Sequence, residues 1–160
     1  PPGVTVGRIE SARDMLAACE AALPADVAVC AAAVADWRVA EMADEKLKKN
    51  GAGPPALEMA ENPDILASLA AANNTRPGLV IGFAAETEQV VEHARAKRER
   101  KGCDWILAND VSPETGTFGG ADNTIHLVSA DGVEDWPRMS KDDVADRLAD
   151  RIAETLEKSE

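Results

Sequence analysis

The residues best suited to chemistry are cations gathered in a strongly acidic chain. Eight of the 17 lysines and arginines lie in two short stretches, although the formal net charge is −12. One stretch contains Lys46, Lys48 and Lys49, and the other covers residues 95–101. Such clusters indicate an anionic ligand whose charge they balance. The alternatives are a solvated charged loop for the first stretch and, for the second, cations stabilised by the negative end of a helix dipole.

A helix is expected over residues 88–101, and its inner face changes character along its length. Val90 and Ala94 begin a stripe that Lys97 and Lys101 continue, at spacings that keep all four on nearly one face. If these lysines were simply solvated, we would not expect them on the same face of the helix as the buried residues. We therefore expect both lysines to point along the edge of the domain toward something anionic.

Polar and aromatic residues near strand ends are further candidates. Asp36 follows an expected strand of small apolar residues, 27–33, whose backbone a flat or bulky ligand can approach. In open α/β sheets the carboxyl ends of the strands bind ligands. Asp36 would accept a hydrogen bond from a ligand hydroxyl or cap a loop, and Asn109-Asp110 has the same two interpretations. Phe83 would stack on a nucleobase or, more commonly for this residue type, lie in the core.

The segment Asn62-Pro63-Asp64-Ile65-Leu66 predicts a helix start. Asn62 is expected as the N-cap, Pro63 at the first helical position and Asp64 in the first turn. The free N–H groups there suit an anion or the polar edge of a base. Simple capping of the helix is the alternative.

The spacing of apolar residues and turn signals predicts an α/β fold of one domain, residues 1–160. Its mostly parallel, Rossmann-like sheet has helices on both faces, forming three layers, and an antiparallel C-terminal hairpin at Asp131-Gly132. Ser11, Thr87 and Ser140 are expected helix caps. Residues 39–55 are expected to form a mobile loop that carries the first basic cluster. The strands are expected at 4–9, 27–33, 56–61, 78–85, 104–108 and 124–129, and the helices at 11–23, 62–72, 88–101 and 140–156.

Composition excludes several classes of protein and site. The 29 acids against 17 bases disfavour nucleic acid, and no apolar run reaches the ~20 residues of a membrane span. Cys19, Cys30 and Cys103 are interpreted as reduced thiols of a cytoplasmic protein, and no signal peptide is visible. His93 and His126 are too isolated to predict a zinc site. No nucleophile–base pair or phosphate-binding glycine motif is found.

Six segments together resemble one enzyme family along essentially the whole chain. The family is bacterial phosphopantothenate–cysteine ligase, the synthetase half of the bifunctional coenzyme A biosynthesis protein. The segments occur in the family's order and at close to its spacing. They are AAAVADWR (31–38), EKLKK (45–49), ENPDIL (61–66), IGFAAET (81–87), ARAKRERKGCD (94–104) and ANDV (108–111).

The resemblance implies a reaction that needs no protein nucleophile. CTP would react with the carboxylate of phosphopantothenate, releasing pyrophosphate and forming an acyl-cytidylate. The amine of L-cysteine would then give the amide and release CMP, with Mg²⁺ assisting; the metal ligands are left open. Cations would hold the triphosphate and stabilise the charge that develops at the α-phosphorus. The resemblance further implies a cytoplasmic homodimer and no flavin in this part.

The resemblance also implies site residues, position by position. Lys46, on a loop that closes over the site, would be the catalytic residue. Lys97 and Lys101 would contact the phosphates. The implied nucleotide-binding residues are Ala31, Ala32, Asp36, Lys46, Pro63, Asp64, Ile65, Leu66, Phe83, Lys97 and Lys101.

One departure from the family lies at the start of the chain. The sequence begins at Pro1, after the position of the family's Ser-Asn-x-Ser-Ser-Gly segment, which carries an Asn that acts on the acyl-nucleotide. We therefore expect a fragment that lacks an N-terminal strand–loop–helix. The alternative function is a non-catalytic nucleotide-binding α/β module that kept the pocket and lost the chemistry.

Overall fold

The computed structural model describes residues 2–41, 56–112 and 122–158, so Lys46, Lys48 and Lys49 lie outside the described ranges. The helices are α1 (Ala12–Ala21), α2 (Ile65–Ala70), α3 (Val90–Lys101) and α4 (Lys141–Glu157), with a short 3-10 helix, η1 (Asn73–Thr75). The strands are β1 (Val27–Cys30), β2 (Trp37–Val39), β3 (Met59–Glu61), β4 (Leu79–Glu86), β5 (Trp105–Asp110), β6 (Asp122–Asn123), β7 (Ile125–Val128), β8 (Val133–Asp135) and β9 (Met139–Ser140).

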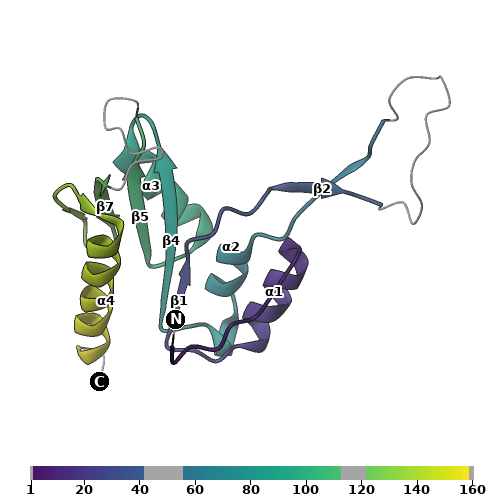
Figure 1. Cartoon of the computed structure of the whole chain (residues 1–160), viewed down its shortest axis with the longest axis horizontal. Coiled ribbons are helices and arrows are strands. Elements are labelled where there is room, and N and C mark those ends of the chain that lie inside the picture. Colours follow the sequence, from purple (N-terminus) through teal and green to yellow (C-terminus); the bar gives the residue numbers. More distant parts are fainter. Residues whose placement is uncertain (1, 42–55, 113–121, 159–160) are drawn as a thin grey trace.

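A five-stranded sheet in the order β1-β4-β5-β7-β8 forms the centre of the molecule (Figure 1). β1, β4 and β5 pair in parallel, and β7 runs antiparallel to both β5 and β8. Gly132 has a φ of 144° in the β7–β8 turn, a conformation that glycine adopts without a Cβ clash. The prediction of a mostly parallel sheet with a C-terminal hairpin is confirmed.

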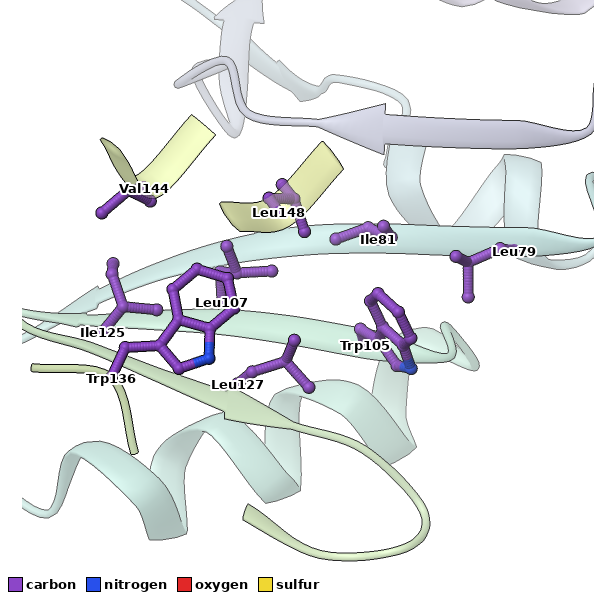
Figure 2. Packing of buried hydrophobic residues seen from close by; sticks show 9 residues of the cluster. All are labelled: Leu79, Ile81, Trp105, Leu107, Ile125, Leu127, Trp136, Val144 and Leu148. Atoms are coloured by element: carbon purple, nitrogen blue, oxygen red, sulfur yellow. The ribbon is translucent and has the colours of Figure 1, made fainter. Parts of the chain in front are cut away.

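Helices cover both faces of the sheet, as predicted. Val144 and Leu148 of α4 pack against one face, where Figure 2 shows them beside sheet residues that include Ile81 and Leu107. Leu66 of α2 and Ala94 of α3 pack against the other face. α1 lies beside α2 (Figure 1). The apolar residues of the central strands alternate between these two clusters, which explains the near-continuous burial of β4 and β5.

Two helix caps agree with the sequence and two do not. Ser11 and Ser140 accept hydrogen bonds from the backbone N–H groups of Asp14 and Asp143, as N-caps do. Thr87 is not a cap, because α3 begins only at Val90, after Gln89 in a left-handed conformation.

At α2 the N-cap is Asp64 instead of Asn62. The carboxylate of Asp64 accepts from the N–H of Ala67 at 3.0 Å, so the helix begins after Pro63 rather than at it. α2 is also shorter than predicted: it ends at Ala70, and η1 follows.

The first part of the chain differs most from the prediction. Residues 4–9 form no strand, and their side chains are exposed. β1 is shorter than the expected strand over 27–33 and only partly buried, with Val29 47% exposed. The reason is that β1 lies at the edge of the described sheet and pairs with β4 on one side only. Its apolar sequence predicted burial but could not show that the other side has no neighbouring strand in the described residues.

Part of the expected loop over 39–55 belongs to a two-stranded arm. β2 pairs antiparallel with β3, Trp37 opposite Glu61 and Val39 opposite Met59. Figure 1 shows this arm extending away from the sheet. Of the predicted strand 56–61, Met59–Glu61 is present. None of the helices in the described ranges is long and apolar enough to cross a membrane.

Candidate functional site

An open cleft of about 1130 Å³ lies around β1 and the carboxyl end of β4. Its walls come from α1, β1, the segment that follows β1, the start of α2, the last part of β4 and the second half of α3. This is the edge of the sheet at which open α/β folds bind ligands. The parallel arrangement of β1 and β4 therefore brings together segments that are far apart in the sequence.

The cleft gathers every predicted nucleotide-binding residue that the structure describes. Lys46 lies outside the described ranges, so its predicted catalytic role stays a prediction. The predicted residues that line the cleft are Ala31, Ala32, Asp36, Pro63, Asp64, Ile65, Leu66, Phe83, Lys97 and Lys101.

Lys97 is a partly buried cation with a neutral partner. Its Nζ donates a hydrogen bond to the backbone carbonyl oxygen of Phe83 at 2.8 Å. Within the described ranges Lys97 has no carboxylate partner in an ion pair. An ammonium group carries three N–H donors, so the single bond to Phe83 leaves two donors for an anion in the cleft.

Lys101 forms an ion pair with Asp64 and so joins α3 to the start of α2. Partial burial raises the pKa of Asp64, but the hydrogen bonds from Lys101 and from the Ala67 amide outweigh it. The pKa of this carboxyl group therefore lies below its ordinary value. Asp64 thus stays ionised at neutral pH, caps the helix and holds Lys101 at the rim of the cleft.

Asn62 ties two walls of the cleft together, a role that its assignment as a helix cap did not predict. Its side-chain Nδ2 donates to the carbonyl oxygen of Ala35, and its backbone N–H donates to that of Asp36, both at 2.8 Å. These bonds hold the segment that follows β1 against the chain that leads into α2. The carboxylate of Asp36 is left exposed on the cleft wall.

Gly82 sets the distance between β4 and α2. A Cβ at this position would lie 2.5 Å from Cδ2 of Leu66 and 2.9 Å from Cδ1 of Ile106. Glycine therefore lets α2 pack directly on β4, which places the start of α2 beside the strand end. Phe83, the next residue, is partly buried and packs against the core on the α4 face. Its ring therefore serves mainly to fill the core.

Two thiols, Cys19 and Cys30, also line the cleft. Burial raises the pKa of Cys30 above its ordinary value, with smaller contributions from neighbouring ionisable groups. Its thiol is therefore protonated at neutral pH, and a protonated thiol is a poor nucleophile. The three cysteines of the described residues are free, as predicted.

The described part of the cleft provides few metal ligands. No group of three or more His, Cys, Asp or Glu side chains suited to a metal ion occurs in the described residues. Asp36, Glu61 and Asp64 are the carboxylates among its lining residues. Mg²⁺ in nucleotide sites is commonly held by one or two carboxylates together with the phosphates, so this donor set fits a metal that arrives with a nucleotide.

The sequence comparisons identify the family. Residues 1–156 match the family described as the DNA/pantothenate metabolism flavoprotein C-terminal domain, and the chain belongs to this family. Among curated relatives, the coenzyme A biosynthesis bifunctional protein CoaBC of Escherichia coli strain K12 is 42% identical over 95% of this chain. CoaBC of Mycobacterium bovis is 41% identical over 98% of it. The chain spans 38% and 40% of the lengths of these two proteins.

Solved structures support the fold. The crystal structure of the C-terminal domain of a CoaBC protein matches with a TM-score of 0.76 and 32% identity, covering 99% of this chain and 69% of that chain. The DNA/pantothenate metabolism flavoprotein from Streptococcus pneumoniae matches with a TM-score of 0.70 over 96% of this chain and 72% of that chain. Its 19% identity supports the fold alone.

Proposed function

We propose that this chain is the CTP-dependent phosphopantothenate–cysteine ligase part of a coenzyme A biosynthesis enzyme. Membership of the family and the names of its relatives support this function. The observation that carries it is Lys97, a partly buried ammonium in the cleft whose described partner is a neutral carbonyl. Such a group suits a phosphate, because it offers free charge-assisted donors.

The proposed reaction uses the cleft to position substrates and to balance charge. The phosphopantothenate carboxylate attacks the α-phosphorus of CTP, and pyrophosphate leaves with the electrons of the broken P–O bond. The cysteine amine then attacks the acyl carbon of the acyl-cytidylate, loses a proton and displaces CMP. Lys97 and Lys101 stabilise the phosphates, Asp36 accepts a hydrogen bond from a ligand hydroxyl, and Lys46 acts at the reacting atoms.

The small side chains of Ala31 and Ala32 leave their backbone open to the nucleotide. At the start of α2, after Pro63, the residues Asp64, Ile65 and Leu66 offer backbone N–H groups that lack partners within the helix. Asp36 would help to hold a Mg²⁺ ion that arrives with the nucleotide, and the ion would supply neutralisation of the phosphate charge. No flavin is part of this proposal.

We further propose that the protein works in the cytoplasm as a homodimer, and the β2–β3 arm supports the dimer. Trp37, Leu57 and Met59 are each more than half exposed on or beside the β2–β3 arm. A two-stranded ribbon is marginally stable alone, and an exposed apolar surface of this kind favours burial against another chain. A second copy of the chain is the partner we propose.

Calorimetric titration with CTP and with ATP, in the presence of Mg²⁺, tests the nucleotide site of this chain. We expect saturable binding with preference for CTP. In parallel, release of pyrophosphate is measured for the protein as its gene encodes it, with phosphopantothenate and L-cysteine. CTP binding without any turnover would favour a non-catalytic nucleotide-binding module, and absence of both would contradict the proposal.

A further inference from the structure

Residues 31–36, which connect β1 to β2, have no regular structure of their own. They form neither helix nor strand, and all of them except Val34 are exposed. This segment nevertheless gives the cleft Ala31, Ala32 and Asp36. An exposed, irregular segment has many accessible backbone conformations unless contacts with other segments fix it. The position of Asp36 therefore depends on the contacts that hold residues 31–36.

Those contacts come from Asn62. Its side-chain Nδ2 donates a hydrogen bond to the carbonyl oxygen of Ala35, and its backbone N–H donates to the carbonyl oxygen of Asp36, both at 2.8 Å. Within the described part of the chain, no other residue outside 31–36 forms a hydrogen bond with the backbone of this segment. One side chain and one amide thus fix two successive carbonyl groups on either side of the Asp36 Cα.

Asn62 is itself held firmly by the chain that follows it. Pro63 comes next, and its ring restricts the backbone φ at that position. α2 then begins at Ile65, and both Ile65 and Leu66 are buried in the core. The position of Asn62 is therefore set by a packed helix, whereas the segment that it holds is exposed. The two hydrogen bonds transmit the placement of α2 to Asp36.

We propose that Asn62 is a positioning residue that orients the Asp36 carboxylate toward a hydroxyl of the bound nucleotide. The inference rests on the proposed function, in which Asp36 accepts a hydrogen bond from a ligand hydroxyl. An ionised carboxylate only accepts hydrogen bonds, so its distance and angle to the O–H donor decide how much the contact contributes. Asn62 needs no contact with the nucleotide for this role, because it acts through the backbone of Ala35 and Asp36.

Two substitutions of Asn62 remove the side-chain donor and leave the backbone N–H in place. Asn62→Ala deletes the carboxamide. Asn62→Asp keeps its shape but places a carboxylate oxygen against the carbonyl oxygen of Ala35, which cannot donate to it. Both variants are expected to fold, because Asn62 is not fully buried and Asp64 is the N-cap of α2. Asn74→Ala is the matched control, since Asn74 is exposed in η1 and does not line the cleft.

The discrimination between CTP and 2′,3′-dideoxy-CTP is the measurement, because the second nucleotide lacks both ribose hydroxyls. Calorimetric titration of the protein as its gene encodes it, with Mg²⁺ present, gives the ratio of the two Kd values. Wild type and Asn74→Ala are expected to bind CTP about tenfold or more tightly. In both Asn62 variants the ratio should fall below about threefold, as in Asp36→Ala. The ratio compares two ligands on the same folded protein, so a loss of stability alone does not change it.

Two results would overturn the inference. One is a wild-type ratio in both Asn62 variants, which would show that the segment holds Asp36 without the side chain of Asn62. The other is a wild type that binds the two nucleotides equally well, because Asp36 would then contact no ribose hydroxyl. A wild type that binds neither nucleotide would instead contradict the proposed function, so the two failures are distinguishable.

Discussion

At the scale of single residues, the two described lysines of the cleft have different partners and therefore different roles. Lys101 forms an ion pair with Asp64 and links α3 to α2. Much of its charge is therefore balanced within the protein. Lys97 is held by a carbonyl group, which orients the ammonium without neutralising it. Lys97 is therefore the better candidate for contact with a phosphate.

Replacement of Lys97 by alanine is expected to weaken nucleotide binding. Loss of a charge-assisted hydrogen bond costs about 1.5–3 kcal/mol, which corresponds to roughly a ten- to hundredfold rise in Kd for CTP. Calorimetric titration in the presence of Mg²⁺ measures it. Arg95→Ala is the matched control, because Arg95 is exposed on the same helix and does not line the cleft. An equal Kd for Lys97→Ala and wild type would remove Lys97 from the site.

At the scale of elements, the site depends on two close contacts between segments. Asn62 joins the segment after β1 to the start of α2, and Gly82 lets α2 lie directly on β4. Neither residue acts on a substrate in the proposed reaction. Both set where Asp36, Asp64 and the first turn of α2 lie, so changes at these positions should act through the shape of the cleft.

Gly82→Ala is expected to destabilise the chain by about 1–3 kcal/mol, the usual cost of overpacking a core. The added methyl group would meet Leu66 and Ile106 at distances below ordinary contact. Gly7→Ala is the control, because nothing lies within 4 Å of a Cβ built there. Its stability is expected within about 0.5 kcal/mol of wild type. Urea denaturation measures both, and equal midpoints would contradict the packing argument.

Glu134 anchors α4 to the sheet through an ion-pair network. It accepts hydrogen bonds from Trp136 at 2.9 Å and from Arg147 and Arg151 at 3.1 Å. Partial burial raises the pKa of Glu134, but the bonds from Arg151, Arg147 and Trp136 outweigh it, so the pKa lies below its ordinary value. The stability that the ionised carboxylate contributes is present above the unfolded-state pKa, and it is lost as the pH falls through the folded-state pKa.

Glu134→Gln is expected to lower the free energy of unfolding by about 1 kcal/mol at pH 7, because the network is partly screened by solvent. The same variant should lose less stability than wild type as the pH falls from about 5 to about 3. Denaturant titrations at several pH values measure both effects. Glu154→Gln is the control, since its contact with Arg151 is longer, at 3.4 Å, and more exposed. Identical pH profiles for all three proteins would contradict the role of Glu134.

At the scale of the whole molecule, the two ends of the sheet differ in how much of their apolar surface is exposed. α4 covers one face of the sheet, and the β7–β8 hairpin forms one of its two ends. At the other end β1 is an edge strand, and the β2–β3 arm projects with its apolar residues exposed (Figure 1). The cleft lies on this open side, so association through the arm would act close to the site.

Self-association is expected to depend on the apolar residues of the arm. Wild-type chain should show a concentration-dependent mass above that of the 16.9 kDa monomer in analytical ultracentrifugation. The double variant Trp37→Ser/Met59→Ser should shift the distribution toward monomer, because it removes the apolar surface that we expect the partner to bury. Val6→Ser is the control, as Val6 is 71% exposed but lies off the arm. Equal distributions for the variant and wild type would exclude the arm as the interface.

Local sequence patterns by themselves predicted most of the elements and the edge of the sheet at which the cleft lies. Alternation and apolar spacing predicted β4, β5, α3 and α4, because such patterns depend on residues close together in the chain. The Lys97–Lys101 stripe and the strand ends pointed to one edge of the sheet, and the predicted residues that are described do meet there. The predicted single domain and its missing N-terminal segment stay predictions.

Only the tertiary structure decided what each of these residues contacts. The bond from Lys97 to Phe83 spans 14 positions, and those from Asn62 to Ala35 and from Lys101 to Asp64 span 27 and 37. Local propensity contains no information on such pairs, which is why Asn62 was assigned as a cap and residues 4–9 as a strand. Edge exposure at β1 and the unpaired Oδ1 of Asn109 likewise follow from which segments pack together, and sequence spacing does not encode that choice.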